Sequence, residues 1–199
     1  MKLRLIFYEA LLALSVLLVF LVPTSYATPV CWPENGHYYD AVPGGSDGFS
    51  WNEARTAAQN SVFMGYSGDL ATITSPEEND FIVSNFPEAF YKGYWLGGFQ
   101  PPGSEEPSGG WQWVTGEQWE FTKWALHEPN NENLFPGHPP EDSLCFRTYE
   151  PYGFGAWNDW YQDIKQPDIG YVVEYPVPEP AIICLLGLGG LALLRKRRA

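Results

Sequence analysis

The chain has few basic residues away from its two ends. Of its eleven Lys and Arg residues, only five lie between positions 10 and 194, whereas 23 of its 24 Asp and Glu residues fall in that interval. Such a surface repels phosphate backbones and lacks the basic stripe that nucleic-acid binding requires. The charge distribution therefore excludes nucleic acid as a partner and favours cations as ligands.

The motifs of common enzymes are also missing. The histidines, His37, His127 and His138, lack a metal-binding spacing such as His-x-x-x-His, and the chain has no Gly-x-Ser-x-Gly motif or phosphate-binding loop. Paired carboxylates are present, and a glycosidase places such a pair on either side of the bond that it cleaves. Because asparagines cluster beside these carboxylates, metal binding is favoured. We expect no enzymatic activity, with a polysaccharide hydrolase as the least favoured alternative.

Aromatic residues, in contrast, are abundant. The chain has 199 residues, of which 17% are Phe, Trp or Tyr, including nine Trp. This composition excludes an intrinsically disordered chain. The length allows one globular domain with an additional segment at each end.

The N-terminal segment has the pattern of a secretory signal peptide. Lys2 and Arg4 precede an apolar run over residues 10–22, which is short for a retained anchor helix. Small residues occupy the first and third positions of the Ser-Tyr-Ala segment that ends at Ala27. We therefore expect a signal peptide over residues 1–27 and export to a compartment where disulfides and calcium are available.

The C-terminal segment combines three features of a sorting signal. Pro-Glu-Pro at 178–180 is followed by an uncharged apolar run over 181–194 and by four basic residues. As a transmembrane helix the run would span about 21 Å, which is short for a hydrocarbon core of about 30 Å. Residues 176–199 resemble the bacterial PEP-CTERM sorting signal. The resemblance implies that the tail enters the inner membrane and is removed by an exosortase-type protease, leaving the protein at the cell surface, in the extracellular matrix or secreted.

The middle of the chain predicts two helices followed by short strands. Ser-x-x-Glu patterns at Ser50 and Ser75 are typical of capping boxes and predict helices over residues 51–60 and 76–85. The polar stretch 125–143 lacks periodicity, and a loop of that length in a compact domain is usually functional. Aromatic or alternating runs predict strands over residues 37–42, 69–74, 94–98, 111–114, 118–124, 144–146, 156–157 and 171–174.

Oxygen-bearing side chains gather in and after this long loop. Glu128, Asn130, Glu141, Asn158 and Asp159 provide the carboxylate and amide oxygens that calcium prefers. A cis bond before the proline between the first two would aim their carbonyl groups toward one centre. The composition alone leaves open a calcium site or an acidic loop that is merely solvated.

The order of motifs resembles the C-type lectin domain over residues 28–175. The motifs are Trp-Leu-Gly-Gly at 95–98, Glu-Pro-Asn at 128–130, Glu-Asp at 141–142, Trp-Asn-Asp at 157–159 and the strand ending at Glu174. The resemblance implies an α+β fold with two helices, short antiparallel strands and a long calcium-binding loop. It also implies that Ca²⁺ and a carbohydrate share five ligands: Glu128, Asn130, Glu141, Asn158 and Asp159.

The same resemblance implies a preference among sugars. In the family, Glu-Pro-Asn accompanies mannose-type diols, whereas Gln-Pro-Asp favours galactose. Two neighbouring hydroxyls would coordinate calcium while donating to the carboxylates and accepting from the amides. We therefore expect calcium-dependent binding of an exopolysaccharide or surface glycan. The alternative is a structural or adhesion matrix protein in which the same fold makes protein contacts.

The chain departs from the family pattern in its cysteines. Cys184 lies in the sorting signal, and the spacing of Cys31 and Cys145 matches neither disulfide of the family. A bond between those two therefore stays open. So does an auxiliary calcium site near Asn131, Asp142 and Glu77 or Glu78. Trp119, Trp124 and Trp160 are candidates for stacking on sugars, although core packing is the favoured interpretation.

Overall fold

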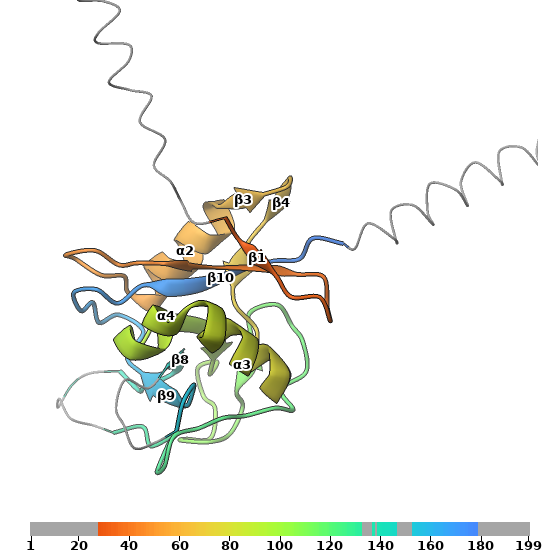
Figure 1. Ribbon diagram of the computed structural model, residues 1–199. Helices are drawn as coiled ribbons and strands as arrows, with labels where there is room; N and C mark the ends of the chain where they lie inside the picture. Colours follow the sequence, from red (N-terminus) through yellow and green to blue (C-terminus); the bar gives the residue numbers. More distant parts are fainter. Residues whose placement is uncertain (1–27, 133–136, 138, 147–152, 179–199) are drawn as a thin grey trace, which may run out of the picture.

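In the computed structural model, the described residues are 28–132, 137, 139–146 and 153–178. The expected signal peptide and the sorting signal beyond residue 178 lie outside these ranges. None of the helices within them combines the length and apolar composition that a membrane span requires. The α+β fold class is confirmed: two main helices flank a mixed sheet (Figure 1).

Eight strands form the main sheet, with the spatial order β1-β2-β10-β6-β8-β9, and with β5 beside β10 and β7 beside β6. A separate hairpin consists of β3 (Val62–Phe63) and β4 (Tyr66–Ser67). The bounds of the main-sheet strands are β1 Val30–Cys31, β2 Tyr38–Val42, β5 Asp69–Leu70, β6 Trp95–Phe99, β7 Gln112–Trp113, β8 Ser143–Phe146, β9 Trp157–Trp160 and β10 Tyr171–Tyr175.

The sheet differs from the expected antiparallel arrangement in one pairing. β10 runs parallel to β6, with Tyr171 opposite Trp95, whereas β10 pairs with β2 and β5 in the antiparallel sense. The prediction of a strand over residues 118–124 is wrong. Within that segment only Trp124 forms a bridge, with Trp157 of β9. The aromatic residues of this segment pack against the core through their rings. The same alternation of residue types is found in a strand, so the sequence pattern does not distinguish the two.

Helix α2 (Trp51–Asn60) begins and ends where its sequence pattern predicts. The Ser50 side chain accepts from the main-chain N–H of Glu53, and the Glu53 carboxylate accepts from the main-chain N–H of Ser50. This reciprocal capping box satisfies two N–H groups that the first turn otherwise leaves unpaired. The helix packs its buried face, Trp51, Ala54 and Ala58, against the sheet.

Helix α3 (Pro76–Asn85) confirms its predicted bounds but forms only half of the expected box. The Ser75 hydroxyl accepts from the main-chain N–H of Glu78. The Glu78 carboxylate does not return to Ser75 but accepts from the main-chain N–H of Thr74 (2.7 Å) and from the hydroxyl of Tyr39. A short helix, α4 (Pro87–Lys92), follows and ends at Gly93, whose φ of 69° is left-handed.

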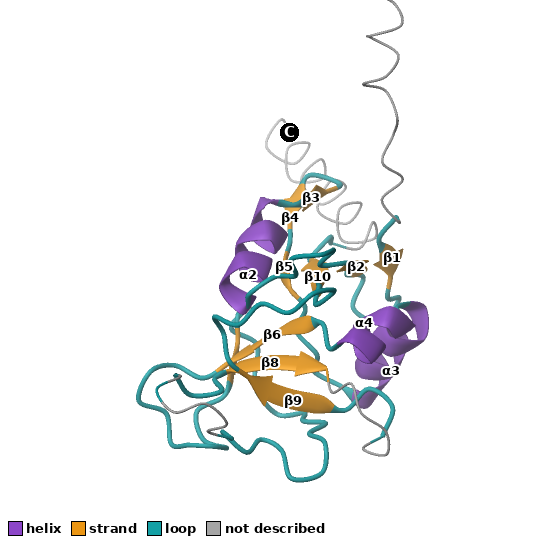
Figure 2. Ribbon diagram, turned by 90° about the vertical axis from the view of Figure 1, so that its left-hand side faces the viewer, coloured by secondary structure: helices purple, strands orange, loops and turns teal. Residues whose placement is uncertain are grey.

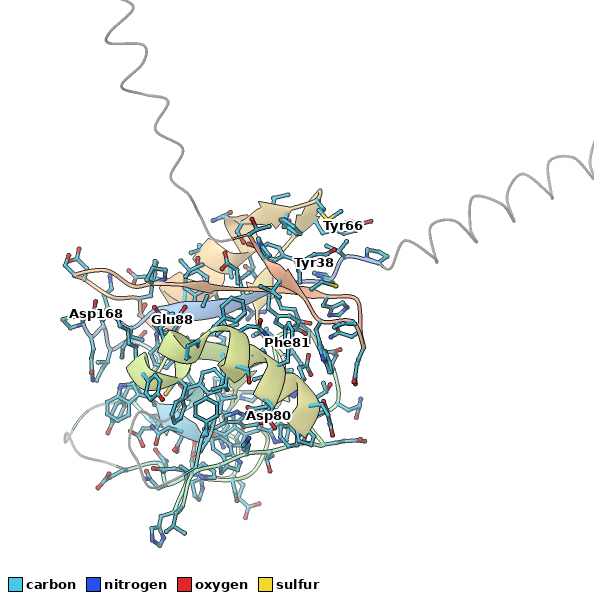
Figure 3. The ribbon with its side chains drawn as sticks, in the orientation of Figure 1. Tyr38, Tyr66, Asp80, Phe81, Glu88 and Asp168 are labelled. Atoms are coloured by element: carbon cyan, nitrogen blue, oxygen red, sulfur yellow. The ribbon has the colours of Figure 1, made fainter. Side chains whose placement is uncertain are left out.

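The sheet separates two hydrophobic cores. Figure 2 shows α2 on one side of the strands and α3 and α4 on the other. Since neighbouring side chains of a strand point to opposite faces, Leu96 and Leu144 pack toward α3 and α4, while Trp95 and Cys145 pack toward α2. The hairpin extends the second core, because Phe63 packs on Tyr38 with ring centroids 5.0 Å apart. Figure 3 shows Tyr38 and Tyr66 at this end of the molecule.

The topology excludes a bond between Cys31 and Cys145. Cys31 lies in β1 and Cys145 in β8, and three strands stand between them in the sheet. Neighbouring strands lie about 4.8 Å apart, whereas a disulfide requires Cα atoms within about 7 Å of each other.

A hydrogen-bond network ties the C-terminal strand to strand β2 and to the segment that follows β5. Glu174 of β10 accepts from His37 (2.5 Å), from the hydroxyl of Tyr39 (3.1 Å) and from the main-chain N–H of Thr72 (2.8 Å). The hydrogen bond with Glu174 raises the pKa of His37, against the opposing effect of burial. The imidazole of His37 therefore binds a carboxylate that is almost completely buried, and this contact favours its protonated form.

Replacing Ser50 with alanine should destabilise the fold by about 1 kcal/mol, because the first turn of α2 loses a capping acceptor. Chemical denaturation with urea measures the loss. Ser84→Ala, at an exposed position inside α3, is the matched control and should change the unfolding free energy far less. Equal effects of the two substitutions would contradict the role of the cap.

The His37–Glu174 pair should make stability depend on pH. Because the folded-state pKa of His37 is raised, its contribution is complete below the unfolded-state value of about 6.5 and is lost as pH rises through the folded-state pKa. His37→Gln should remove that loss from the unfolding free energy measured across this window. His127→Gln, in an exposed loop, should keep the wild-type profile; a wild-type profile in His37→Gln would contradict the pairing.

Candidate functional site

The start of the long loop is hydrogen-bonded to strand β9. The main-chain N–H of Ala125 donates to the carbonyl of Trp157 (2.9 Å), and the N–H of Trp157 donates to the carbonyl of Lys123 (2.8 Å). Lys123 also forms an ion pair with Asp80 of α3 (2.9 Å), which is labelled at the foot of that helix in Figure 3. The loop base is thus fixed to the sheet. The Glu128–Pro129 peptide bond that follows is cis.

Asp159 of β9 holds the first half of the loop. Its carboxylate accepts from the main-chain N–H groups of Asn130 (3.0 Å) and Asn131 (2.8 Å). Asp159 is completely buried, whereas Asn130 is exposed. Hydrogen bonds from N–H groups to a carboxylate are stronger than bonds between neutral groups. This contact therefore places the Glu-Pro-Asn motif directly over the Trp-Asn-Asp strand.

Glu141 holds the two ends of the loop together. The main-chain N–H of Glu132 donates both to Oδ1 of Asn130 (2.8 Å) and to Oε2 of Glu141 (2.7 Å). In return, the N–H of Glu141 donates to Oδ1 of Asn131 (3.0 Å). One amide nitrogen is thus shared by oxygens of two predicted ligands.

The remaining predicted ligands lie at the same place. Asn158 precedes Asp159 in β9, and its side-chain amide donates to the carbonyl of Asp159 (2.5 Å). Glu128 is half-buried and forms a hydrogen bond with the side chain of Asp159. The structure therefore brings together the predicted ligands Glu128, Asn130, Glu141, Asn158 and Asp159.

The carboxyl groups of this site resist ionisation. Burial raises the pKa of Glu141 to about 8, and the charges of Asp159 and Glu128 add to the rise. Burial also raises the pKa of Asp159, although bonds from the main chain and from Glu128 oppose it. Like charges in one buried site cannot all ionise unless a cation compensates them.

The donor set is suited to calcium, but its oxygens do not form a closed coordination shell. Among the described residues, no group of three or more His, Cys, Asp or Glu side chains is arranged to hold a metal ion. In this arrangement, main-chain N–H groups of the loop occupy oxygens of Asp159 and Glu141. The residues nevertheless offer only hard oxygen ligands, which is the chemistry that calcium selects.

Sequence reasoning missed two residues here. Glu132 contributes through its main chain, since its carbonyl also accepts from the hydroxyl of Tyr161; main-chain roles leave no signature in residue type. Glu106 lies in a different loop, and the charges of Asp142 and Asp159 contribute to its raised pKa after burial. Glu78, considered for an auxiliary calcium site, is bound instead to Thr74 and Tyr39.

Comparison with known proteins agrees with this geometry. Residues 48–161 match the model of the Lectin C-type domain, and residues 176–198 match the PEP-CTERM protein-sorting motif. Such a motif implies an exported protein that is sorted to the cell surface and processed by an exosortase. Members of the lectin family are typically binding proteins without enzymatic activity.

Three similar proteins illustrate the range of the family. Halomucin of Haloquadratum walsbyi is 32% identical over 71% of this chain, which matches only 1% of halomucin. A lectin of Pleurodeles waltl is 30% identical over 71% of each chain. The cow C-type carbohydrate-recognition domain of CD23, crystallised in the presence of a GlcNAc2Man3 oligosaccharide, shares the fold with a TM-score of 0.52 at 23% identity, covering 76% of this chain and all of that one.

These matches have one consequence for classification. More than half of the chain fits the family model, and the relative from Pleurodeles waltl is similar over most of its own length. The chain belongs to the C-type lectin family and ends in a PEP-CTERM protein-sorting motif.

Proposed function

We propose that the protein binds carbohydrate in a calcium-dependent manner and prefers mannose-type sugars. The observation that supports this most strongly is the convergence of Glu128, Glu141 and Asp159 on one site in which burial raises the pKa of two of the three carboxyl groups. Such a site becomes more favourable when a divalent cation compensates its charge.

Calcium would be held by Glu128, Asn130, Glu141, Asn158 and Asp159. Three carboxylates and two amides supply hard oxygens, and their combined charge exceeds that of one Ca²⁺. Oxygens that now accept from main-chain N–H groups of the loop, those of Asp159 and Glu141, would exchange these bonds for the ion. The loop from Asn130 to Glu132 would adjust as it does so.

Sugar binding follows from the remaining donors and acceptors. Two neighbouring hydroxyls on a sugar ring can each give calcium one lone pair, donate a proton to a carboxylate and accept from an amide. Glu128 and Glu141 supply acceptors, and Asn130 and Asn158 supply donors. The Glu-Pro-Asn motif at 128–130 is the reason to favour mannose-type diols.

The proposed path to the cell surface uses both ends of the chain. Residues 1–27 would direct export and be removed, leaving residues 28–175 as the lectin domain. Residues 176–199 would hold the protein in the inner membrane until an exosortase-type protease removes them. The natural glycan would then be an exopolysaccharide or a surface glycan.

A second candidate function is that of a structural or adhesion protein of the matrix. It is favoured by the β3–β4 hairpin, where Val62 and Met64 expose 64% and 63% of their surface. Exposed apolar side chains at a projecting hairpin suit protein contacts. In that case calcium would order the long loop without a sugar.

A glycan array probed with and without a calcium chelator tests the proposal. We expect binding to mannose-type glycans in calcium and its loss with chelator, because the diol is held through the ion. Calcium-dependent thermal stability without glycan binding would instead support the matrix protein. Release of sugar with time would indicate a hydrolase and contradict both.

Glu141→Gln should separate calcium binding from folding. We expect the variant to lose the rise in melting temperature that calcium gives the wild type, because one charged ligand is removed. With chelator present it should be at least as stable as the wild type, since the amide avoids burying a charge. Glu120→Gln, at an exposed position, is the control and should keep the calcium response. A full calcium response in Glu141→Gln would contradict the ligand assignment.

A further inference from the structure

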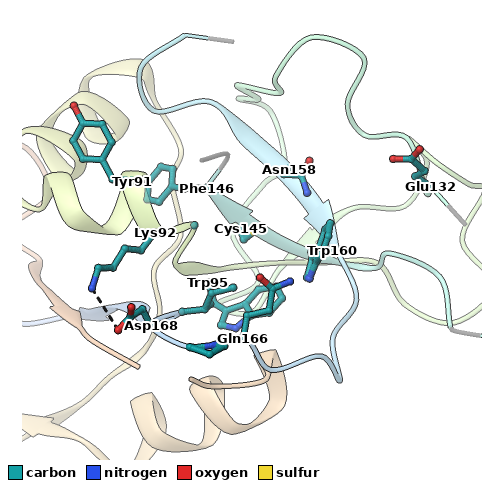
Figure 4. Close-up of a pocket in the computed structure, with 13 residues that line it drawn as sticks. Tyr91, Lys92, Trp95, Glu132, Cys145, Phe146, Asn158, Trp160, Gln166 and Asp168 are labelled. Carbon is teal, nitrogen blue, oxygen red and sulfur yellow. Dashed lines mark ion pairs between the residues drawn. The ribbon is translucent and has the colours of Figure 1, made fainter. Parts of the chain in front are cut away.

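A groove of about 550 Å³ runs away from the candidate site across strands β9, β8 and β6. It starts at Glu132, passes Asn158 and Trp160, and ends between Lys92 and Asp168 (Figure 4). Its volume lies within the range of small-molecule sites, about 300–1,000 Å³. None of the sequence motifs or family matches accounts for its far end, which α4 and the segment before β10 build.

The groove is continuous with the candidate site. Asn158 is both a predicted ligand and part of the groove wall. Glu132 lines the groove, and its main-chain N–H donates to Asn130 and Glu141. A molecule bound at the candidate site can therefore extend into the groove without crossing an intervening element.

Trp160 gives the groove a surface for a sugar ring. Its indole is partly exposed and is held by an edge contact with Tyr161, with ring centroids 5.5 Å apart. The indole nitrogen Nε1 is buried and has no hydrogen-bond partner in the part of the chain that the structure describes. A buried donor without a partner costs free energy, and a ligand hydroxyl that accepts from it removes that cost.

The far end of the groove is polar but carries no excess of positive charge. Lys92 and Asp168 form an ion pair of 3.6 Å with both side chains substantially exposed, and Gln166 lies beside them. Their donors and acceptors suit neutral hydroxyl groups. An anionic ligand is disfavoured by Asp168 and Glu132 and by the chain's formal net charge of −13.

We propose that this groove binds the inner sugar residues of an oligosaccharide whose terminal residue occupies the candidate site. The proposal rests on the function proposed above and extends it. The protein then recognises a chain of at least two or three sugars rather than a single terminal ring. Trp160 stacks the face of its indole on one inner residue and donates its in-plane N–H to a hydroxyl of the neighbouring residue, while Gln166 and the Lys92–Asp168 pair bind further hydroxyls.

Calorimetric titration with methyl α-mannoside and with mannotriose, both in calcium, tests the proposal. The readout is the ratio of the two affinities for each variant. The wild type should bind mannotriose more tightly, and both Trp160→Phe, which keeps a ring but loses the N–H, and Gln166→Ala should reduce this advantage by about fivefold, the effect of one hydrogen bond. Gln118→Ala, an exposed glutamine outside the groove, should keep the wild-type ratio.

A second measurement does not depend on the affinities of the variants. In a two-dimensional ¹H–¹⁵N spectrum, mannotriose should shift the indole N–H signal of Trp160, identified by its loss in Trp160→Phe, whereas methyl α-mannoside should leave it in place. If both sugars bind with equal affinity and neither moves that signal, the groove proposal is overturned and the lectin function stands. If neither sugar binds in calcium, both proposals fail.

Discussion

The hydrogen bonds from Asn130 and Asn131 to the buried carboxylate of Asp159 are the contact on which the rest of the site depends. They join the long loop to β9, the strand at the edge of the main sheet. Because the acceptor is completely buried, the loop cannot leave without exposing the carboxyl group of Asp159 to solvent or leaving it without hydrogen-bond partners. The proposed cation would need the same carboxyl group. Asp159 therefore orders the loop and is also a candidate ligand of the ion.

A cluster of tryptophans packs beneath the long loop. Trp113 contacts Trp157 with ring centroids 5.7 Å apart, and Trp119 contacts Trp113 at 4.4 Å. Trp111 and Trp124 extend the cluster with an edge contact of 4.9 Å. These rings lie under the base of the long loop, and their burial offers apolar stabilisation in place of a covalent link. Aromatic residues therefore stabilise the base of the loop as well as the helices, where Trp51 and Phe90 are buried.

Local patterns in the sequence predicted the helices well because capping is a local interaction. Ser50 and Glu53 stand three residues apart, and their bonds are the same in the fold as in the motif. Glu78 shows the limit: its pattern is identical, yet Tyr39, 39 residues away, and Thr74 bind its carboxylate instead. The order of motifs was enough to predict that the candidate ligands lie together. Asn158 and Asp159 are neighbours on β9, and the Glu-Pro-Asn loop binds Asp159. The groove beside Trp160 was not, because its walls meet only through the packing of α4 against the sheet.

The register of the sheet brings both ends of the domain to one edge. Tyr38 of β2 lies opposite Cys31 on one side and opposite Tyr175 on the other. Figure 1 places this edge at the upper end of the molecule and the segment around Asn130 at the lower end. A segment that follows Pro178 therefore leaves the domain on the side opposite the long loop. A domain held there would present its candidate site away from the support, and many copies side by side would all present it outward.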